Sequence, residues 1–350
     1  MQAILGVIFH SIGGFAAGSF YMPYNKVKDW AWESYWIVGG IFSWLIVPLV
    51  AAWITVPVFI EIITETPSQI VFVTFMMGLL WGIGGLSYGL GIRYLGMSLG
   101  NSVVLGFCAA FGALVPPIYY NINPVEGKVS FTDMLVTSGG QLVLLGVVVC
   151  LVGIAISGKA GMMKERELPE EDKGKSIVEF KLVKGLAVAI LSGILSSFFN
   201  FGIEAGKPLA DAAVEAGHHP LFQNNVTFVV ILCGGLITNF IWTTILSFKN
   251  KSYKDFVNRS TPITRNILFS SLAGTIWFFQ FFFFGMGESK LGNGASSWIL
   301  HMSIIILTAN MWGIYRKEWK GIAARTRWTV IFGIVLILLS VVLVGLGNTI

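Results

Sequence analysis

The chain has 350 residues, of which 55% are hydrophobic and only 12% are charged. A soluble domain carries charge on about a quarter of its residues. This composition, with a mean hydropathy of +0.76, therefore excludes an ordinary soluble enzyme and predicts an integral membrane protein. The net charge of +5 calls for no nucleic-acid partner, because the basic residues gather in particular connections between apolar segments.

Ten apolar runs follow one another along the chain, each close to the length of about 20 residues that a bilayer-spanning helix needs. The runs are 3–22, 35–56, 70–92, 99–120, 138–157, 185–206, 225–247, 266–287, 295–314 and 328–347. The alternating strands of a membrane barrel are absent from the sequence. We predict an all-α integral membrane protein with ten transmembrane helices. No Lys or Arg precedes Ala3, so the first run is expected to be a retained helix rather than a cleaved signal peptide.

The basic residues are distributed unevenly over the connections. Twenty of the 23 Lys and Arg residues lie in odd-numbered connections, and three, Lys128, Lys207 and Lys290, lie in even-numbered ones. Loops rich in Lys and Arg stay in the cytoplasm. We therefore expect the odd connections inside and both termini outside, on the periplasmic or extracellular face. The fifth connection, 158–184, mixes both charge signs and is predicted to be a cytoplasmic linker.

Two stretches of the sequence resemble each other at a separation of 196 positions. "GLLWGIGGLSYGLGIRYLG" (78–96) and "GTIWFFQFFFFGMGESKLG" (274–292) match at six of 19 positions, with Trp81 opposite Trp277. A second pair, 6–28 and 185–207, shares glycines, a phenylalanine and a lysine. The first run therefore corresponds to the sixth, and the third run to the eighth.

Each half of the chain holds five runs, an odd number, so the second copy enters the membrane from the opposite side. We predict one transmembrane transporter domain made of two inverted five-helix repeats, 1–157 and 185–350, around the linker. Inverted repeats are typical of secondary transporters, whose substrate site lies near the bilayer midplane between the repeats. A duplicated scaffold without transport is the alternative interpretation.

Ionisable side chains within the runs are few, and such groups usually face the protein interior or a cavity. His10 lies near the middle of the first run and His301 in the ninth. Each imidazole either exchanges a proton or binds a ligand, or it fills the packing between helices. Glu33, among tryptophans at the start of the second run, is either an interfacial carboxylate or a group that burial allows to be reversibly protonated. His10 and Glu33 are thus candidates for proton coupling.

Neutral polar and aromatic side chains suggest a polyhydroxylated ligand rather than an ion. Gln280 interrupts the aromatic sequence "WFFQFFFF", and a buried amide there needs a partner, either a ligand or another helix. Flat aromatic faces suit the C–H face of a sugar, while their N–H or O–H groups bond its hydroxyls. The candidates for substrate binding are Gln280, Trp277, Trp81, Tyr88, His301, Asn225 and Asn200.

Neither a zinc-protease motif nor a nucleotide-binding motif occurs in the chain, since the patterns H-E-x-x-H and G-x-x-x-x-G-K-[ST] are missing. The letters of G-x-S-x-G occur at 85–89, but inside an apolar run rather than at a turn from a strand to a helix. The three cysteines form neither a metal-ligand cluster nor a disulfide framework. We expect no enzyme activity, no metal and no cofactor. The energy for transport then comes from an ion gradient or from the substrate's own gradient, and composition does not distinguish sodium from protons.

Several phrases resemble the bacterial L-rhamnose/proton symporters, a ten-helix branch of the drug/metabolite transporter superfamily. They are "YNKVKDWAWESYW" (24–36), "LWGIGGLSYGLGIRYLGMSLG" (80–100), "GKPLADAA" (206–213), "WFFQFFFFGMG" (277–287) and "SWILHMS" (297–303). The resemblance implies proton-coupled uptake of L-rhamnose across the bacterial inner membrane by alternating access, with L-rhamnose, protons and the lipid bilayer as the partners. It also implies that helices 1–4 and 6–9 surround a central site.

Two alternatives remain open at the level of the sequence. One is a transporter of another sugar or small metabolite in the same superfamily, and the other is a membrane-embedded sugar sensor. Some members of the family carry asparagines where this chain has Gly85 and Ser87, so sugar contacts at these positions are expected to differ.

Overall fold

The computed structural model describes residues 2–95, 97–124, 127, 129–167, 182–292, 294–315, 321–347 and 350. Every regular element among these residues is helical, and none of them forms a strand. The predicted all-α class is therefore confirmed for the part of the chain that is described. Of the predicted linker 158–184, residues 168–181 lie outside the described residues.

Helices occupy all ten stretches in which the sequence predicts them. The long helices are α1 (Gln2–Ser19), α3 (Trp32–Ile41), α6 (Ser68–Leu95), α7 (Met97–Ile122), α9 (Ser138–Glu167), α11 (Leu182–Ala205), α13 (Asn224–Asn250), α14 (Ile263–Leu291), α15 (Gly294–Tyr315) and α16 (Ala324–Gly347). The short ones are α2 (Tyr21–Tyr24), η1 (Phe42–Ile46), α4 (Val47–Thr55), α5 (Phe59–Glu65), α8 (Phe131–Val136), α12 (Lys207–Glu215), η2 (Pro220–Phe222) and η3 (Ser252–Phe256).

Nine helical segments within the described residues are long and apolar enough to cross a membrane. The stretch predicted at 295–314 corresponds to α15, in which the described apolar part, Ser297–Thr308, is shorter. The second predicted span consists of α3, η1 and α4 in succession.

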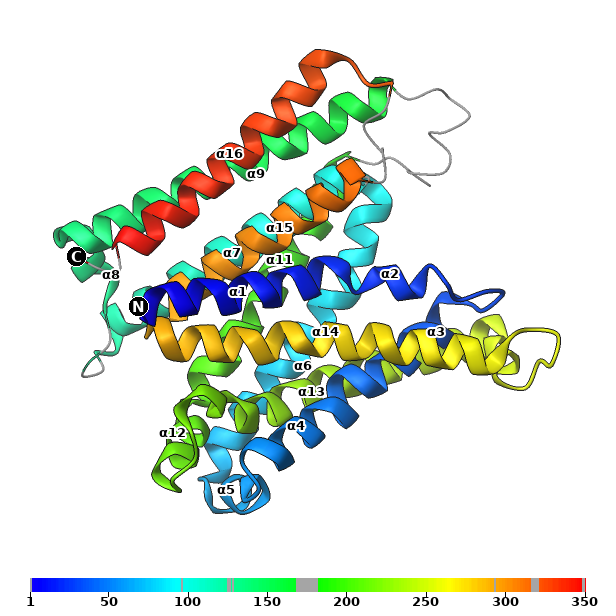
Figure 1. Ribbon diagram of the computed structural model, residues 1–350, viewed down its shortest axis with the longest axis horizontal. Coiled ribbons are helices and arrows are strands. Elements are labelled where there is room, and N and C mark those ends of the chain that lie inside the picture. The colour runs from blue at the N-terminus through cyan, green and yellow to red at the C-terminus, as the bar shows by residue number, and fades with distance from the viewer. Residues whose placement is uncertain are drawn as a thin grey trace. The chain divides into compact units, whose positions relative to one another are not determined.

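The chain divides into two compact units, and neither coincides with a half of the sequence. Unit 1 comprises Met1–Ile83 and Phe201–Lys290, and unit 2 comprises Gly84–Asn200 and Leu291–Ile350. In unit 1, α13 packs against α3, η1, α4 and α12. Helix α1 runs antiparallel to α14 (Figure 1), since the ring of Phe9 stacks on Phe283 while Phe20 meets Trp277.

Two glycines at matching positions of the sequence repeat allow helices of unit 1 to touch through their backbones. A Cβ on Gly78 of α6 would overlap the carbonyl oxygen of Ile231 in α13, and a Cβ on Gly274 of α14 would overlap the carbonyl oxygen of Gly39 in α3. Small residues allow this close approach in membrane proteins. The third predicted span (α6) therefore packs against the seventh (α13), and the eighth (α14) packs against the second (α3) in the same way.

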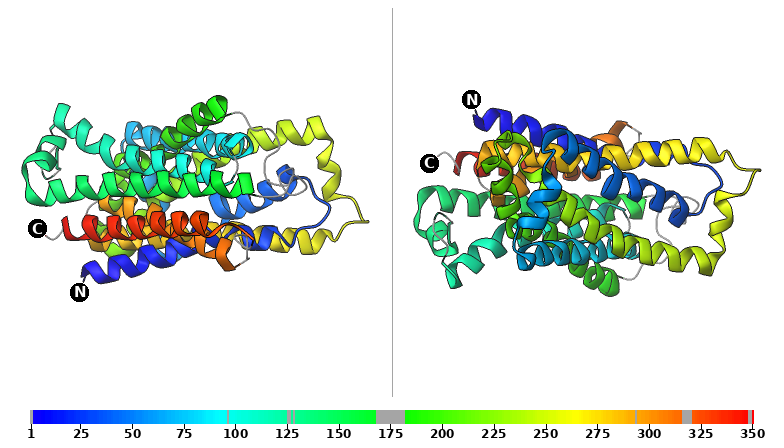
Figure 2. Two further views of the ribbon diagram at one scale, coloured as in Figure 1. Left: turned by 90° about the horizontal axis from the view of Figure 1, so that it is seen from above. Right: turned by 90° about the horizontal axis from the view of Figure 1, so that it is seen from below.

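In unit 2, α9 and α16 lie side by side along their length (Figures 1 and 2), and α7 packs against α9 and α15. Helix α9 continues to Glu167, ten residues beyond the predicted run. The carboxylate of Glu167 accepts hydrogen bonds from the backbone N–H of Ala323 and the hydroxyl of Thr326. The end of α9 thereby satisfies donors at the start of α16, which otherwise have no partner within their own helix.

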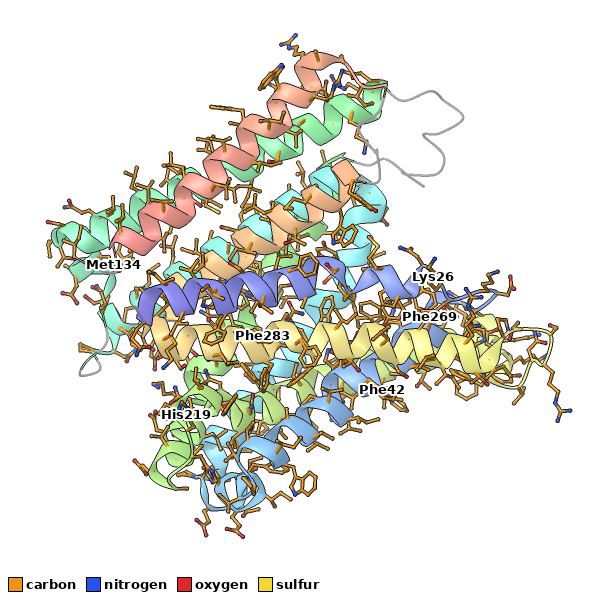
Figure 3. All side chains as sticks on the ribbon, viewed as in Figure 1. Lys26, Phe42, Met134, His219, Phe269 and Phe283 are labelled. Carbon is orange, nitrogen blue, oxygen red and sulfur yellow. The ribbon has the colours of Figure 1, made fainter. Side chains whose placement is uncertain are left out.

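Basic connections meet at one end of each unit. In unit 1, the backbone N–H and C=O of Lys28, between α2 and α3, both bond the side-chain amide of Asn266 at the start of α14. Figure 3 shows Lys26 at this end of unit 1, where Phe269 also lies. In unit 2, the contact of Glu167 with α16 brings Lys164 and Arg166 to the end where Arg325 and Arg327 begin α16.

Candidate functional site

The second span of unit 1 contains a π-helical turn, η1, which ends at Ile46, two residues before Pro48. Proline has no N–H and cannot donate to the carbonyl four residues earlier, which here belongs to Trp44. Insertions of this kind occur frequently at functional sites. The turn places Ser43 and Trp44 inside the unit, where both side chains are buried. Gly40 makes room for the indole of Trp44, because a Cβ there would overlap its ring.

Trp44 belongs to a chain of aromatic rings that crosses unit 1. Its centroid lies 6.0 Å from Trp36 and 6.3 Å from Trp81. Trp36 in turn lies 6.3 Å from Trp277, and Trp81 lies 5.8 Å from Phe281. These five residues, called the aromatic cluster below, bring together the two tryptophans that the repeat pairs across 196 positions.

Buried hydrogen-bond donors accompany the cluster. Nε1 of Trp44, Nε1 of Trp277 and Nε2 of Gln280 are buried, and none of these atoms has a hydrogen-bond partner among the described residues; the same holds for Oγ of Ser43. Burying such a group without a partner costs about 1–3 kcal/mol on mutational scales. Trp36 differs, because its Nε1 donates to Oδ1 of Asn239 over 3.1 Å.

The aromatic cluster and Gln280 combine flat apolar ring faces with N–H groups that lack an acceptor among the described residues. Polar side chains in a largely apolar pocket fix the orientation of a small ligand. A neutral ligand that carries several hydroxyl oxygens would supply the missing acceptors. Sequence reasoning predicted Trp277, Trp81 and Gln280 but missed Ser43 and Trp44. The signal for both was Pro48, which interrupts the helix of the second span.

His10 is fully buried in the contact between α1 and α14. Its ring meets Phe284 edge-on at 5.3 Å, and a Cβ on Gly287 would lie 2.6 Å from its Nε2. The glycine that the repeat pairs with Gly91 therefore provides the space that the imidazole occupies.

Glu33 is buried at the start of α3, as part of a polar contact with the connection between α13 and α14. Its carboxylate accepts hydrogen bonds from Oγ of Ser252 at 2.6 Å and Nδ2 of Asn250 at 3.0 Å. One turn away, Asp255 accepts from the backbone N–H of Ala31 and the hydroxyl of Ser34. Carboxylates at a helix N-terminus are favoured by the helix dipole. The immediate partners of the Glu33 carboxylate are thus polar side chains rather than the neighbouring tryptophans.

The remaining candidates divide between the two units. In unit 1, Asn225 donates to Oγ1 of Thr55. In unit 2, Asn200 donates to the carbonyl of Gly112, His301 is buried in α15, and Tyr88 packs near Val104 and Ala189. The two asparagines therefore already have protein partners.

The described residues also form a hollow that contains none of these candidates, and they offer no metal site. A hollow of about 420 Å³ in unit 2 is lined by side chains of α9 and α16, among them Lys159, Arg325 and Trp328. No group of three His, Cys, Asp or Glu side chains in the described part of the chain is arranged to hold a metal ion.

Comparison with known proteins identifies the family of this chain. The family model "L-rhamnose-proton symport protein (RhaT)" matches residues 1–350. The chain is 38% identical over 349 residues to the L-rhamnose-proton symporter of Yersinia pestis (strain Pestoides F), covering 98% of each chain. It is 37% identical over 348 residues to that of Cronobacter sakazakii (strain ATCC BAA-894), covering 98% of this chain and 97% of the relative. The chain therefore belongs to the L-rhamnose-proton symport protein family.

Proposed function

We propose that this protein imports L-rhamnose together with protons by alternating access. The observation that carries the proposal is the aromatic cluster, in which the buried N–H groups of Trp44 and Trp277 have no partner among the described residues, in a chain that matches the symporter family along its whole length. Relatives at 38% identity are named L-rhamnose-proton symporters. The chemistry of the cluster fits a sugar better than an ion.

The proposed sugar contacts follow from the chemistry of a deoxyhexose. Its methyl group and C–H face would lie against the rings of Trp81 and Trp277, because aromatic faces bind apolar surface while their N–H groups bond hydroxyls. Trp44, Trp277 and Gln280 would donate to hydroxyl oxygens that accept hydrogen bonds. Tyr88, His301, Asn200 and Asn225 stay candidates for further contacts, and His10 and Glu33 for proton coupling.

We propose for the whole chain ten transmembrane helices in two inverted repeats, 1–157 and 185–350, as in the drug/metabolite transporter superfamily. The reciprocal glycine contacts support this, since Gly78 sets α6 on α13 as Gly274 sets α14 on α3. An inverted repeat with corresponding helices at 78 and 274 predicts such an exchange of partners.

We also propose that both termini are periplasmic and that the protein lies in the bacterial inner membrane. Support comes from the end of unit 1 where the connections holding Lys28 and Lys254 meet, and from the end of unit 2 where Arg166 and Arg325 meet. Basic connections remain on the cytoplasmic side.

The decisive experiment measures transport by the full chain reconstituted in liposomes. Labelled L-rhamnose should accumulate when the outside is made acidic, and a protonophore should abolish the accumulation. Excess unlabelled L-rhamnose, a 6-deoxyhexose, should compete for uptake. The matching hexose, which carries a hydroxymethyl group in place of the methyl group, should compete weakly. Equal uptake of L-rhamnose with and without the proton gradient would refute symport. Equal competition by both sugars would refute the assignment of the substrate.

A further inference from the structure

Glu288 is a carboxylate inside the membrane-spanning segment Ile263–Leu291, three residues before the end of α14. It is half-buried and accepts a short hydrogen bond from Nδ2 of Asn224, the buried first residue of α13. Ionisable groups in a membrane span are costly and mark pathways for ions or protons. Neither the repeat nor the sugar contacts proposed above account for this side chain.

His10 lies against the same turn of α14. Phe284 contacts its ring, and Gly287, the residue directly before Glu288, leaves the space that its Nε2 occupies. On the neighbouring face, a Cβ on Gly285 would lie 3.2 Å from Cβ of Asn224. Helices α1, α13 and α14 therefore place an imidazole, an amide and a carboxylate around one helical turn.

The surroundings of Glu288 act on its charge in opposite directions. The hydrogen bond from Asn224 and the N-terminus of α13 favour the ionised carboxylate, whereas the low dielectric of an aromatic membrane interior favours the neutral acid. Described groups at this turn include Asn224 and Phe228 on α13 and His10 on α1, and Lys290 follows on α14 itself. Phe9 and Phe222 contact Phe283 and Phe282, which lie further back along α14. A change in water access can then decide the protonation state.

We propose that Glu288 is the proton-binding site of the transport cycle, with Asn224 as its positioning residue. The inference rests on the proposed symport function. The Glu288 carboxylate takes one proton from water on the outer side, where α14 ends in the orientation proposed above, and loses its negative charge. The protein then changes its access from the outer to the inner side with the sugar bound and Glu288 neutral. The proton is released to water on the inner side, which restores the carboxylate.

The test compares Glu288→Gln with wild type in the same liposomes. For one proton per sugar, a gradient of one pH unit supports about a tenfold concentration ratio. Wild type should reach this ratio. Glu288→Gln should only equilibrate the sugar and should move no protons into liposomes that contain a pH-sensitive dye. Because exchange of labelled for unlabelled sugar needs no net proton movement, it should continue in this variant and show that the protein is folded.

Matched variants separate proton binding from general damage. Glu215→Gln, at an exposed carboxylate that ends α12, should accumulate sugar as wild type does, and Glu288→Asp should restore part of the accumulation. Asn224→Ala removes the amide that donates to the Glu288 carboxylate, so the pH profile of coupled proton uptake should differ from that of wild type, whereas the profile of Glu215→Gln should not.

Wild-type accumulation by Glu288→Gln would overturn the assignment of Glu288. Loss of coupling in His10→Gln or Glu33→Gln in the same assay would then assign proton binding to that residue instead. Failure of the wild-type protein itself to accumulate L-rhamnose would instead refute the proposed function, so the two failures are distinguishable.

Discussion

At the scale of single residues, the indole N–H groups of unit 1 fall into two kinds. Trp36 donates to Asn239 within the protein, whereas Trp44 and Trp277 have no partner among the described residues. The aromatic composition of the spans revealed that indoles were plentiful but gave no means of separating these roles. Separation depends on which atom of another helix each N–H meets, and that is set by packing.

The pair Trp44→Phe and Trp36→Phe tests this division, because each change keeps an aromatic ring and removes one N–H. Trp44→Phe should weaken L-rhamnose binding by about tenfold, the equivalent of one hydrogen bond of roughly 1.4 kcal/mol, without lowering the melting temperature. Trp36→Phe should lower the melting temperature by leaving Asn239 without this donor. Binding calorimetry and thermal unfolding in detergent measure both quantities. Equal loss of affinity in the two variants would contradict the division.

Gln280→Ala should likewise reduce affinity by about tenfold, since its Nε2 is buried and lacks a hydrogen-bond partner in the described structure. The control is Gln2→Ala at the exposed start of α1, which should bind as wild type does. Unchanged affinity of Gln280→Ala would assign Gln280 to packing.

At the scale of elements, the apolar runs predicted where each long helix lies, because length and hydrophobicity determine membrane spans. They did not predict the π-helical turn η1, where Pro48 interrupts the ladder of backbone hydrogen bonds. They also ended the fifth helix at 157, although α9 continues to Glu167. Hydropathy falls there, whereas the helix is sustained by contacts with α16 that no single stretch of sequence contains.

Glycine substitutions test the helix contacts of the repeat. Gly78→Ala and Gly274→Ala should each lower stability by about 1–3 kcal/mol, because a new methyl group would overlap a backbone carbonyl. Gly89→Ala is the control, since no atom lies within 4 Å of a Cβ at that position, and the variant should be as stable as wild type. Thermal unfolding in detergent measures the difference, and three equal melting temperatures would contradict the contacts.

At the scale of the whole molecule, the sequence predicted both the class of protein and the family to which it belongs. Trp81 and Trp277, which the repeat places at matching positions, both lie in the aromatic cluster. The division into units was not predicted, because α6 and α11 each contribute residues to both. A boundary within a continuous helix leaves no mark in composition. Glu288 was missed for a related reason, as a carboxylate beside Lys290 near a helix end resembles an interfacial pair.

Membrane orientation can be tested with single cysteines in a variant that lacks Cys108, Cys150 and Cys233. Cysteines at the exposed positions Glu61 and Val136 should react with a membrane-impermeant maleimide in intact cells. Cysteines replacing Lys254 and Arg327, exposed at the basic ends, should react only after permeabilisation. The opposite pattern would place both termini in the cytoplasm.

The contact of Glu33 and Asp255 with their partners has a mechanical consequence. Hydrogen bonds join the start of α3 to the end of α13 and to η3 in the connection to α14, so these segments are constrained to move together. The second span bends most easily at η1, because the proline that follows removes one backbone hydrogen bond there. Ser43 and Trp44 lie in η1, so a movement of the basic end of unit 1 would change the position of the Trp44 N–H within the aromatic cluster.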